Sequence, residues 1–336
     1  MVETAALKDL LAKPKQIVVT THHKPDGDAM GSALGLYNYL IQKGHHVTVI
    51  TPTDYPQFFD WMPGNGEVII YTENTEAANI LINKAEIIIC TDFNALGRIN
   101  EMGEVVRQTS AFKIMIDHHL EPEDFDDWRW WNINACASAQ LVYEFIADVM
   151  QEPQYINKDV ASCLYTGIMT DSGSFRFPST TSSVHRITAA LIDAGADNAR
   201  IHQLVYDNSS ESRLRFLGFC LSEKLTILPE YHTAYIAVTH EELERYEIIT
   251  GDTEGVVNFA LSITGIKLAA FIVERTDKIK LSLRSRGEFP ANEICKRFFS
   301  GGGHRNAAGG SSTDTLAETV EKFKSILPEY KKLLIQ

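Results

Sequence analysis

Three potential metal ligands lie within one short stretch near the start of the chain. His22, Asp26 and Asp28 offer one imidazole and two carboxylates, which are suitable ligands for divalent cations such as Mn²⁺ and Mg²⁺. The stretch follows a β-branched run of strand type and precedes apolar residues at helical spacing, so it is predicted to be a strand-to-helix turn. Pro25 and Gly27 favour a tight backbone that lets both carboxylates converge. The pattern predicts half of a metal site, which needs further ligands from elsewhere in the chain.

Further ligand candidates follow other predicted elements. Apolar strand-like runs alternate with helical patterns over the first part of the chain, and this alternation predicts a parallel sheet with crossover helices. The strand-like runs are Gln16–Thr21, His46–Thr51, Glu86–Thr91 and Ala111–Ile116. Asp92 follows the third run, Asp117-His118-His119 follows the fourth, and Asp171 ends a predicted helix that begins near 158. Because open α/β sheets bind ligands at the carboxyl ends of their strands, we expect these side chains to gather at one edge.

Composition limits the classes of protein to which the chain can belong. The 336 residues are 44% hydrophobic and 22% charged, which is enough for two ordinary domains with cores of their own. A formal net charge of −13 argues against a basic face that wraps long nucleic-acid duplexes, although metal ions and a few arginines can still attract a small anion. No segment approaches the roughly 18 to 20 apolar residues that cross a bilayer, and the first residues lack a secretion signal. We therefore expect a cytoplasmic protein without membrane contact.

The cysteines and two aromatic stretches are interpreted as structural. The five cysteines are scattered and never form a C-x-x-C pair, which favours reduced core residues over a structural zinc site. Phe125–Ile133 is interpreted as a surface connection whose tryptophans serve packing, and Phe175 and Phe177 as core residues on either side of Arg176. Base stacking by the tryptophans and a substrate contact by Arg176 are the less favoured alternatives.

A second set of elements follows a helical segment that carries no ligand cluster, at about 183–225. The predicted elements are a strand at Thr233–Thr239, a helix near Thr253–Ile263 and strands near Ile266–Glu274 and Ile279–Arg284. The chain then reaches a glycine-rich run, Gly301–Gly310, which contains His304 and precedes a helix from about Leu316. Such a glycine density exposes backbone N–H groups and is typical of a loop that lies against a phosphate.

The ligand candidates, in this order along the chain, closely resemble the motifs of the DHH phosphoesterase superfamily. The matching residues are His22-x-x-Pro25-Asp26-Gly27-Asp28, Asp92, Asp117-His118-His119, Asp171 and the glycine-rich run with His304. The resemblance covers nearly the whole chain and points to the DHH/DHHA1 subfamily. It implies a two-domain α/β protein: a parallel-sheet, metal-binding DHH domain at 1–182, a helical connector at 183–229 and a smaller α/β, substrate-binding DHHA1 domain at 230–336. A homodimer would also be consistent with this family.

The resemblance further implies two divalent metal ions, usually Mn²⁺, with Mg²⁺ or Co²⁺ as alternatives. The residues that correspond to the ligands of one ion are His22, Asp26 and Asp92, and those of the other ion are Asp28, Asp92, His118 and Asp171. Asp92 would bridge the two ions. Two ions about 3.5 to 4 Å apart can deprotonate a shared water and neutralise charge that develops on a phosphoryl group.

The remaining candidates concern the substrate. His119 is the candidate that binds a phosphate oxygen or protonates the leaving alkoxide, because imidazole titrates near neutral pH, and Asp117 would orient it. By resemblance, Arg284 and the segment Gly302-Gly303-His304 would hold the nucleotide or its terminal phosphate. The planar guanidinium of arginine suits bidentate contact with phosphate. Arg98 and Arg286 are further candidates for substrate contact.

Together, the motifs and the resemblance predict a metal-dependent phosphoesterase that cleaves short oligoribonucleotides to 5′-mononucleotides, with 3′-phosphoadenosine 5′-phosphate as a second candidate substrate. The expected partners are short RNA or nucleotides, not long duplexes. Alternatives that share the same ligands are a cyclic or linear dinucleotide phosphodiesterase, a RecJ-like single-strand exonuclease, and a pyrophosphatase or polyphosphatase. A different class of alternative is a nucleotide sensor without catalysis. Loss of ligands would indicate a sensor, and here every expected ligand position is filled.

Overall fold

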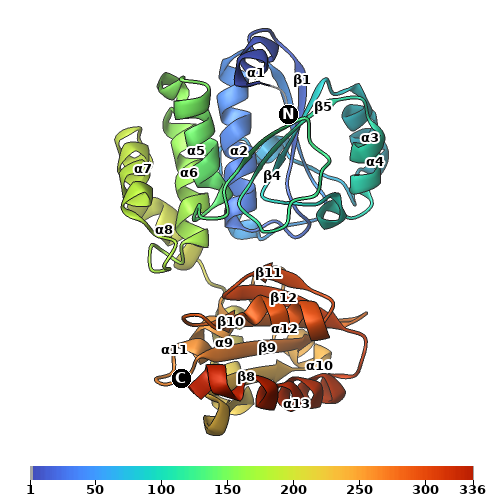
Figure 1. Cartoon of the computed structure of the whole chain (residues 1–336), viewed down its shortest axis with the longest axis vertical. Coiled ribbons are helices and arrows are strands. Elements are labelled where there is room, and N and C mark those ends of the chain that lie inside the picture. Colours follow the sequence, from blue (N-terminus) through green and yellow to red (C-terminus); the bar gives the residue numbers. More distant parts are fainter. Residues whose placement is uncertain (1–2, 336) are drawn as a thin grey trace. The chain divides into compact units, whose positions relative to one another are not determined.

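The computed structural model describes residues 3–335 of a chain that divides into two compact units, Met1–Asn208 and Ser209–Gln336. Each unit contains a six-stranded sheet that is covered by helices (Figure 1). The predicted α/β class is therefore confirmed, with a parallel sheet in the first unit and a smaller mixed α/β unit after it. Among the described residues, no helix has both the length and the apolar character needed to cross a membrane.

The first unit is built on a parallel sheet whose strands include all of those predicted. Its strands are β1 (Gln16–Thr20), β2 (His46–Thr51), β3 (Ile69–Ile70), β4 (Ile87–Thr91), β5 (Phe112–Asp117) and β6 (Trp128–Trp131). They pair in the order β3-β2-β1-β4-β5-β6, and each neighbouring pair is parallel. The strand order reverses between β1 and β4, and open α/β sheets form a crevice for ligands at such a point.

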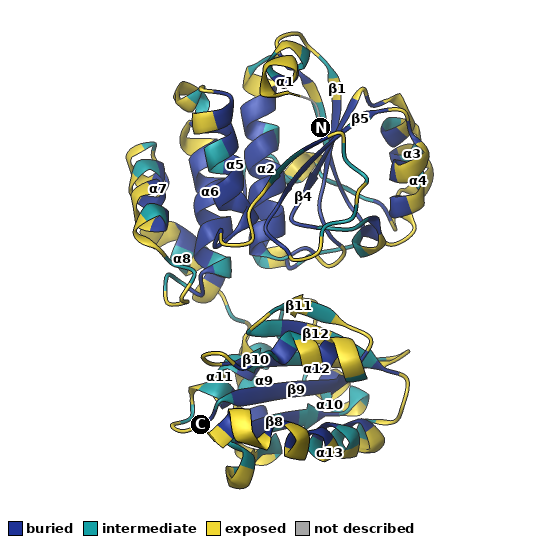
Figure 2. Cartoon of the chain, in the orientation of Figure 1, coloured by how far each residue is buried: buried dark blue, intermediate teal, exposed yellow. Residues whose placement is uncertain are grey.

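Helices cover both faces of this sheet. They are α1 (Thr4–Leu10), α2 (Gly27–Gln42), α3 (Thr75–Lys84), α4 (Met102–Gln108), α5 (Ser138–Glu144), α6 (Lys158–Asp171), α7 (Ser182–Asp193) and α8 (Asn198–Tyr206). Successive residues of a strand point to opposite faces, so Ile17 and Val19 pack with α2, α5 and α6, whereas Val18 packs with α3 and α4. Figure 2 shows α2 and the central strands β1 and β4 buried almost throughout, while α3 and α4 keep exposed outer sides. The continuous apolar runs of the strands follow from burial on both faces.

Close contact between α2 and α6 joins the two helices that carry Asp28 and Asp171. Gly31 of α2 lies against the backbone of α6, because a methyl group on its Cα would be only 2.6 Å from the carbonyl oxygen of Cys163. Gly27, one turn earlier, lies against the side chain of Thr170. The glycines therefore let the start of α2 approach the end of α6.

The prediction for the stretch after β5 was wrong. Residues Trp128–Trp131 form the edge strand β6 rather than a surface connection, and they pair with β5. Trp128 is buried, stacks on Trp130 and meets the Phe145 ring edge-on. A strand of four residues shows too little alternation for its pattern to be distinguished from that of a loop.

The helical segment predicted at 183–229 is shared between the two units. Leu191 of α7 and Ile201 of α8 join the core of the first unit. Phe216 and Phe219, in the next helix, join a core of the second unit. The division between the units falls at 208/209, within this segment.

The second unit is a mixed sheet with helices on both faces. Its strands are β7 (Leu225–Leu228), β8 (Thr233–Val238), β9 (Leu268–Glu274), β10 (Ile279–Ser285), β11 (Gly302–His304) and β12 (Ala307–Ser312), in the order β11-β12-β10-β9-β8-β7. Its helices are α9 (Glu211–Phe219), α10 (His240–Arg245), α11 (Val256–Ser262), α12 (Ala291–Phe298) and α13 (Leu316–Ile335). Leu281 and Leu283 of β10 pack with α12 and α13, whereas Phe271 of β9 packs with α9 and α11.

The glycine-rich run is a β-hairpin and not the predicted loop. Gly302, Gly303 and His304 form β11, which pairs antiparallel with β12. Gly303 has a φ of +130°, and a methyl group on its Cα would lie 2.7 Å from the carbonyl oxygen of Ala307. Glycine is thus required here by close backbone approach within the hairpin, which a count of glycines cannot distinguish from a phosphate-binding loop.

Candidate metal centre and substrate site

The predicted metal ligands gather at the carboxyl edge of the first sheet. His22 follows β1, Asp92 follows β4 and His118 follows β5. Ligand atoms of His22, Asp26 and Asp92 all lie within 4.8 Å of one another. The same is true of ligand atoms of Asp28, Asp92 and His118. Asp92 belongs to both groups. Asp171, at the end of α6, joins the second, with Oδ2 at 3.6 Å from Nε2 of His118. The structure thus brings together all six residues in the two sets that the resemblance implied.

The backbone fixes two of these carboxylates in place. Asp92 has a φ of +61°, in the left-handed region that aspartate tolerates better than most residues, and its N–H donates to the carbonyl of Ile116. Asp26 is the N-cap of α2, and its Oδ1 accepts hydrogen bonds from the N–H groups of Asp28 and Ala29. The turn between β1 and α2 is therefore held by the same side chain that faces His22.

Two imidazoles are oriented by main-chain carbonyls. Nδ1 of His22 lies 2.9 Å from the carbonyl oxygen of His23, and Nδ1 of His118 lies 3.1 Å from that of Ala135. With the proton on Nδ1 donated to these oxygens, Nε2 of each ring faces Asp92, at 3.4 Å for His22 and 3.6 Å for His118. This arrangement is typical of metal-binding histidines.

The start of α5 supplies hydrogen bonds that the sequence interpretation missed. The N–H groups of Ser138 and Ala139 donate to the two carboxylate oxygens of Asp28, at 2.6 and 2.8 Å. The hydroxyl of Ser138 donates to Oδ1 of Asp92 at 2.9 Å. The sequence of α5 contains no motif that indicates this role.

The electrostatics of the cluster fit divalent cations. Burial raises the pKa values of Asp28, Asp92 and Asp171 well above their ordinary range, and repulsion among the carboxylates raises them further. Burial lowers the pKa of His118, but Asp171 and Asp28 outweigh this effect and raise it. Buried carboxylates that repel one another are stabilised by bound cations, and oxygen and imidazole donors without thiolate suit Mn²⁺ or Mg²⁺.

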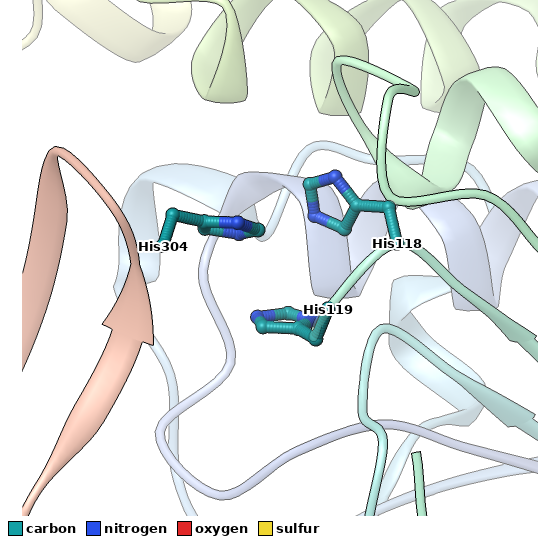
Figure 3. A group of neighbouring side chains, drawn as sticks. All are labelled: His118, His119 and His304. Carbon is teal, nitrogen blue, oxygen red and sulfur yellow. The ribbon is translucent and has the colours of Figure 1, made fainter. Parts of the chain in front are cut away.

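His119 and Asp117 form a pair beside the ligands. Oδ1 of Asp117 lies 2.8 Å from Nδ1 of His119, and its Oδ2 accepts a hydrogen bond from the N–H of His119. The rings of His118 and His119 lie next to each other (Figure 3). Their planes are inclined by 79°. Burial, followed by the positive charge of Arg98, lowers the pKa of His119 well below its ordinary value. Asp117 therefore fixes the orientation of the His119 ring, with Nδ1 toward Asp117 and Nε2 pointing away from it.

Arg98 lies close to the cluster. It belongs to a short 3₁₀ turn, Leu96–Ile99, and its carbonyl accepts a hydrogen bond from the N–H of His23. After burial and the nearby Asp26, its charge is the next influence on the pKa of His22, which it lowers. Arg98, which is predicted to contact the substrate, thus lies near the metal ligands, where its positive charge would attract an anion.

In the second unit, two predicted substrate residues share one row of the sheet. Arg284 of β10 and His304 of β11 both lie opposite Ala307 of β12. Residues that lie directly opposite in antiparallel strands point to the same face, so Arg284 and His304 flank the small side chain of Ala307. Leu283 and Ala308 face the other way, into the core. Arg286 lies beyond the end of β10 and is exposed.

Comparisons with known proteins give a match for each of the two units. The DHH family, N-terminal domain, matches residues 16–168, and the DHHA1 domain matches residues 231–334. A protein named bifunctional oligoribonuclease and PAP phosphatase NrnA from Thermus thermophilus is 30% identical over 293 residues, which cover 87% of this chain and 83% of that protein. The protein of the same name from Bacillus subtilis is 27% identical over 299 residues, 88% of each chain.

A solved structure extends the likeness to the whole chain. The crystal structure of an exopolyphosphatase-related protein from Bacteroides fragilis has a TM-score of 0.94 and 41% sequence identity, and the match covers 99% of this chain and 97% of that one. The order of motifs, the sheet topology and these matches lead to one conclusion: the chain belongs to the DHH/DHHA1 phosphoesterase family.

Proposed function

We propose that the protein is a divalent-metal-dependent hydrolase that cleaves short oligoribonucleotides to 5′-mononucleotides and also removes the 3′-phosphate of 3′-phosphoadenosine 5′-phosphate. The observation that carries the proposal is the convergence of two ligand groups that share Asp92. The names of the relatives from T. thermophilus and B. subtilis support the choice of substrate.

In this proposal, His22, Asp26 and Asp92 would hold one ion, and Asp28, Asp92, His118 and Asp171 the other. The ions, when bound, would supply a hydroxide at neutral pH and charge stabilisation for the phosphoryl group. Hydrolysis would consume one water per phosphodiester, break the bond between phosphorus and O3′, and leave a 5′-phosphate and a 3′-hydroxyl.

The other residues of the site would bind and orient the substrate. His119, held by Asp117, would contact a phosphate oxygen or the leaving oxygen. Arg98 would contribute positive charge close to the ligands. In the second unit, the row that contains Arg284 and His304 would bind a nucleotide phosphate, and Gly302 and Gly303 beside it would allow the phosphate a close approach to the backbone.

The test compares substrate lengths. Purified protein with Mn²⁺ is given a diribonucleotide or a 24-mer RNA, and products are separated by chromatography. We expect 5′-mononucleotides from the diribonucleotide at a far higher rate than from the 24-mer, and no turnover after the metal is removed with a chelator. Equal rates on both lengths, or turnover without metal, would contradict the proposal.

A second candidate function is hydrolysis of inorganic polyphosphate, because the B. fragilis relative is described as exopolyphosphatase-related. The same protein preparation is therefore tested on pyrophosphate, polyphosphate, 3′-phosphoadenosine 5′-phosphate and cyclic dinucleotides. A higher kcat/KM on polyphosphate than on diribonucleotides would replace our proposal with this candidate, and a higher value on cyclic dinucleotides would favour a cyclic dinucleotide phosphodiesterase.

A further inference from the structure

The segment after Asp171 turns back through three successive residues with left-handed backbone. Gly173, Ser174 and Phe175 have φ values of 59°, 58° and 63°. Each non-glycine residue in this region costs about 1 to 2 kcal/mol. Hydrogen bonds hold this strained turn in place: the N–H of Phe175 donates to the hydroxyl of Ser172, and the Ser174 hydroxyl lies 3.1 Å from Nε2 of His202 in α8. A strained turn directly after a predicted metal ligand points to a function for the residues it places.

The turn sends its two phenylalanines in different directions. Phe175 packs inward, edge-on against Tyr165, with ring centroids 5.8 Å apart. Phe177 is 39% exposed, so its prediction as a core residue was wrong. Its ring covers Gly173, because a methyl group on the Cα of Gly173 would lie 2.4 Å from Cζ of Phe177. The result is an exposed aromatic ring held against the backbone two residues from Asp171.

Arg176, the residue directly before Phe177, is also exposed. Its Nε donates to the carbonyl oxygen of Gly173 at 2.6 Å, which fixes the base of the guanidinium over the same turn. Within residues 3–335, no carboxylate forms a salt bridge with Arg176, although the chain carries a formal net charge of −13. The guanidinium can therefore offer its remaining N–H groups to a phosphate.

We propose that Arg176 and Phe177 form a nucleotide subsite in which the guanidinium binds a phosphate and the ring stacks on a nucleobase. The inference rests on the proposed function for the identity of the substrate, and it deepens that function by naming the part of the molecule that recognises the base. Stacking on an aromatic ring is tolerant of sequence, since every base has a π-face. The subsite would therefore favour nucleotides over inorganic phosphates without selecting one base.

The test uses the full chain with Mn²⁺ and three substrates: a diribonucleotide and two analogues, each with one of its two nucleosides replaced by an abasic tetrahydrofuran unit. We expect Phe177→Ala to raise KM for the diribonucleotide about 10-fold or more, with little change in kcat. For one of the two abasic analogues, KM should be the same for Phe177→Ala and the unmodified protein. Phe177→Trp should restore a low KM, whereas Phe177→Leu, which still covers Gly173, should not. Arg176→Ala should raise KM for all substrates.

Phe259→Ala is the matched control, because Phe259 is an exposed phenylalanine, 47% accessible, in α11 of the second unit. It should leave both KM and kcat unchanged. If Phe177→Ala leaves KM unchanged for all three substrates, or raises KM equally for the diribonucleotide and both abasic analogues, the stacking role is wrong and the residue is only structural.

Binding without turnover separates this inference from the proposed function. Calorimetry with adenosine 5′-monophosphate and ribose 5-phosphate needs no hydrolysis, so it gives a result even if the protein does not cleave RNA. We expect Phe177→Ala to weaken binding of the nucleotide about 10-fold and to leave binding of ribose 5-phosphate unchanged. Equal affinities of the unmodified protein for the two probes would overturn the inference, whereas inactivity on the diribonucleotide with a preserved preference for the nucleotide would overturn only the proposed function.

Discussion

Asp92 is the residue on which the metal centre depends, because it belongs to both ligand groups and is buried. Its left-handed backbone conformation and the hydrogen bond from Ser138 hold the carboxylate between His22 and His118. Its position has an electrostatic consequence. Without cations, the cluster confines carboxylates that repel one another, so the charges needed for metal binding destabilise the metal-free protein.

We expect Asp92→Asn to abolish metal-dependent turnover, by about 10³-fold or more, because several kcal/mol of charge stabilisation are lost. The raised pKa of Asp92 means that its ionised form destabilises the folded, metal-free protein as pH rises above the ordinary carboxyl range. The neutral amide should therefore leave the metal-free Tm at pH 7 unchanged or higher. In the unmodified protein, Mn²⁺ at 100 times its Kd should add about 2.7 kcal/mol of stability, and this gain should be lost in the variant. A metal-induced rise in Tm that persists in Asp92→Asn would contradict the role of Asp92 as a ligand shared by the two ions.

The Asp117–His119 pair makes a different prediction, because it lies beside the ligands without belonging to the two implied sets. In Asp117→Asn, the amide oxygen can keep the hydrogen bond from the N–H of His119, so the NH₂ group faces Nδ1 and favours the other tautomer of the ring. We expect Asp117→Asn and His119→Asn each to lower kcat about 10²-fold, and the double variant to lower it by little more than either alone. The Mn²⁺ concentration for half-maximal activity should change little, and a large change in it would mean that the pair binds metal instead.

At the scale of elements, the sequence predicted the parts of the fold that have a long apolar pattern. The four long strands of the first unit were found because strands buried on both faces are continuous apolar runs. Since the ligand candidates follow these strands, their gathering at one edge could also be predicted. The edge strand β6 and the hairpin β11–β12 could not, because short strands and glycines in close backbone contact have no periodic signature.

The parts of the site that escaped prediction depend on contacts between elements. Ser138 and Ala139 matter because the start of α5 meets Asp28, and nothing in the sequence of α5 indicates that neighbour. Phe177 was taken for core because its residue type is apolar, whereas its exposure results from the left-handed turn at Gly173. Arg98 was predicted as a substrate contact, but its position near the ligands depends on the hydrogen bond from the N–H of His23 to its carbonyl, which the sequence does not indicate.

The contact between α2 and α6 gives a prediction for one helix position. A methyl group at Gly31 would lie 2.6 Å from the carbonyl oxygen of Cys163 and 2.8 Å from the N–H nitrogen of Gly167, and backbone atoms of a packed helix cannot move aside easily. We expect Gly31→Ala to lower the free energy of unfolding by about 1 to 3 kcal/mol and to weaken Mn²⁺ binding, because it pushes Asp28 away from Asp171. Urea unfolding and a Mn²⁺ titration measure the two effects.

Gly218→Ala is the matched control for this substitution. Gly218 also lies within a helix, α9, but nothing comes within 4 Å of a methyl group placed there. Alanine should therefore stabilise the protein by up to about 1 kcal/mol through its higher helix propensity, with no change in Mn²⁺ binding. If both variants were destabilised equally, the close approach of α2 and α6 would not be the reason for glycine at position 31.

At the scale of the whole molecule, ionisable groups in both units are buried in their neutral forms. All five cysteines are buried free thiols, and burial raises the pKa values of Cys220 and Cys295, in the second unit, to about 12. In the first unit, burial likewise raises the pKa values of Tyr55 and Tyr165 to about 12. The folded chain therefore retains these protons at pH values where the unfolded chain releases them.

This difference predicts loss of stability at alkaline pH. Unfolded thiols and phenols ionise from about pH 9 and 10, so between these values and about pH 12 the unfolded state binds fewer protons than the folded state. The contribution of these groups to stability is complete below pH 9 and falls as pH rises toward 12. Urea midpoints measured at pH 8, 9.5 and 10.5 should decrease in that order, and thiol labelling should be slow in the folded protein and fast in urea. Tyr165→Phe, which removes one phenol without changing the ring, should make the decrease shallower, and an unchanged pH dependence in this variant would exclude Tyr165 as one of the groups responsible.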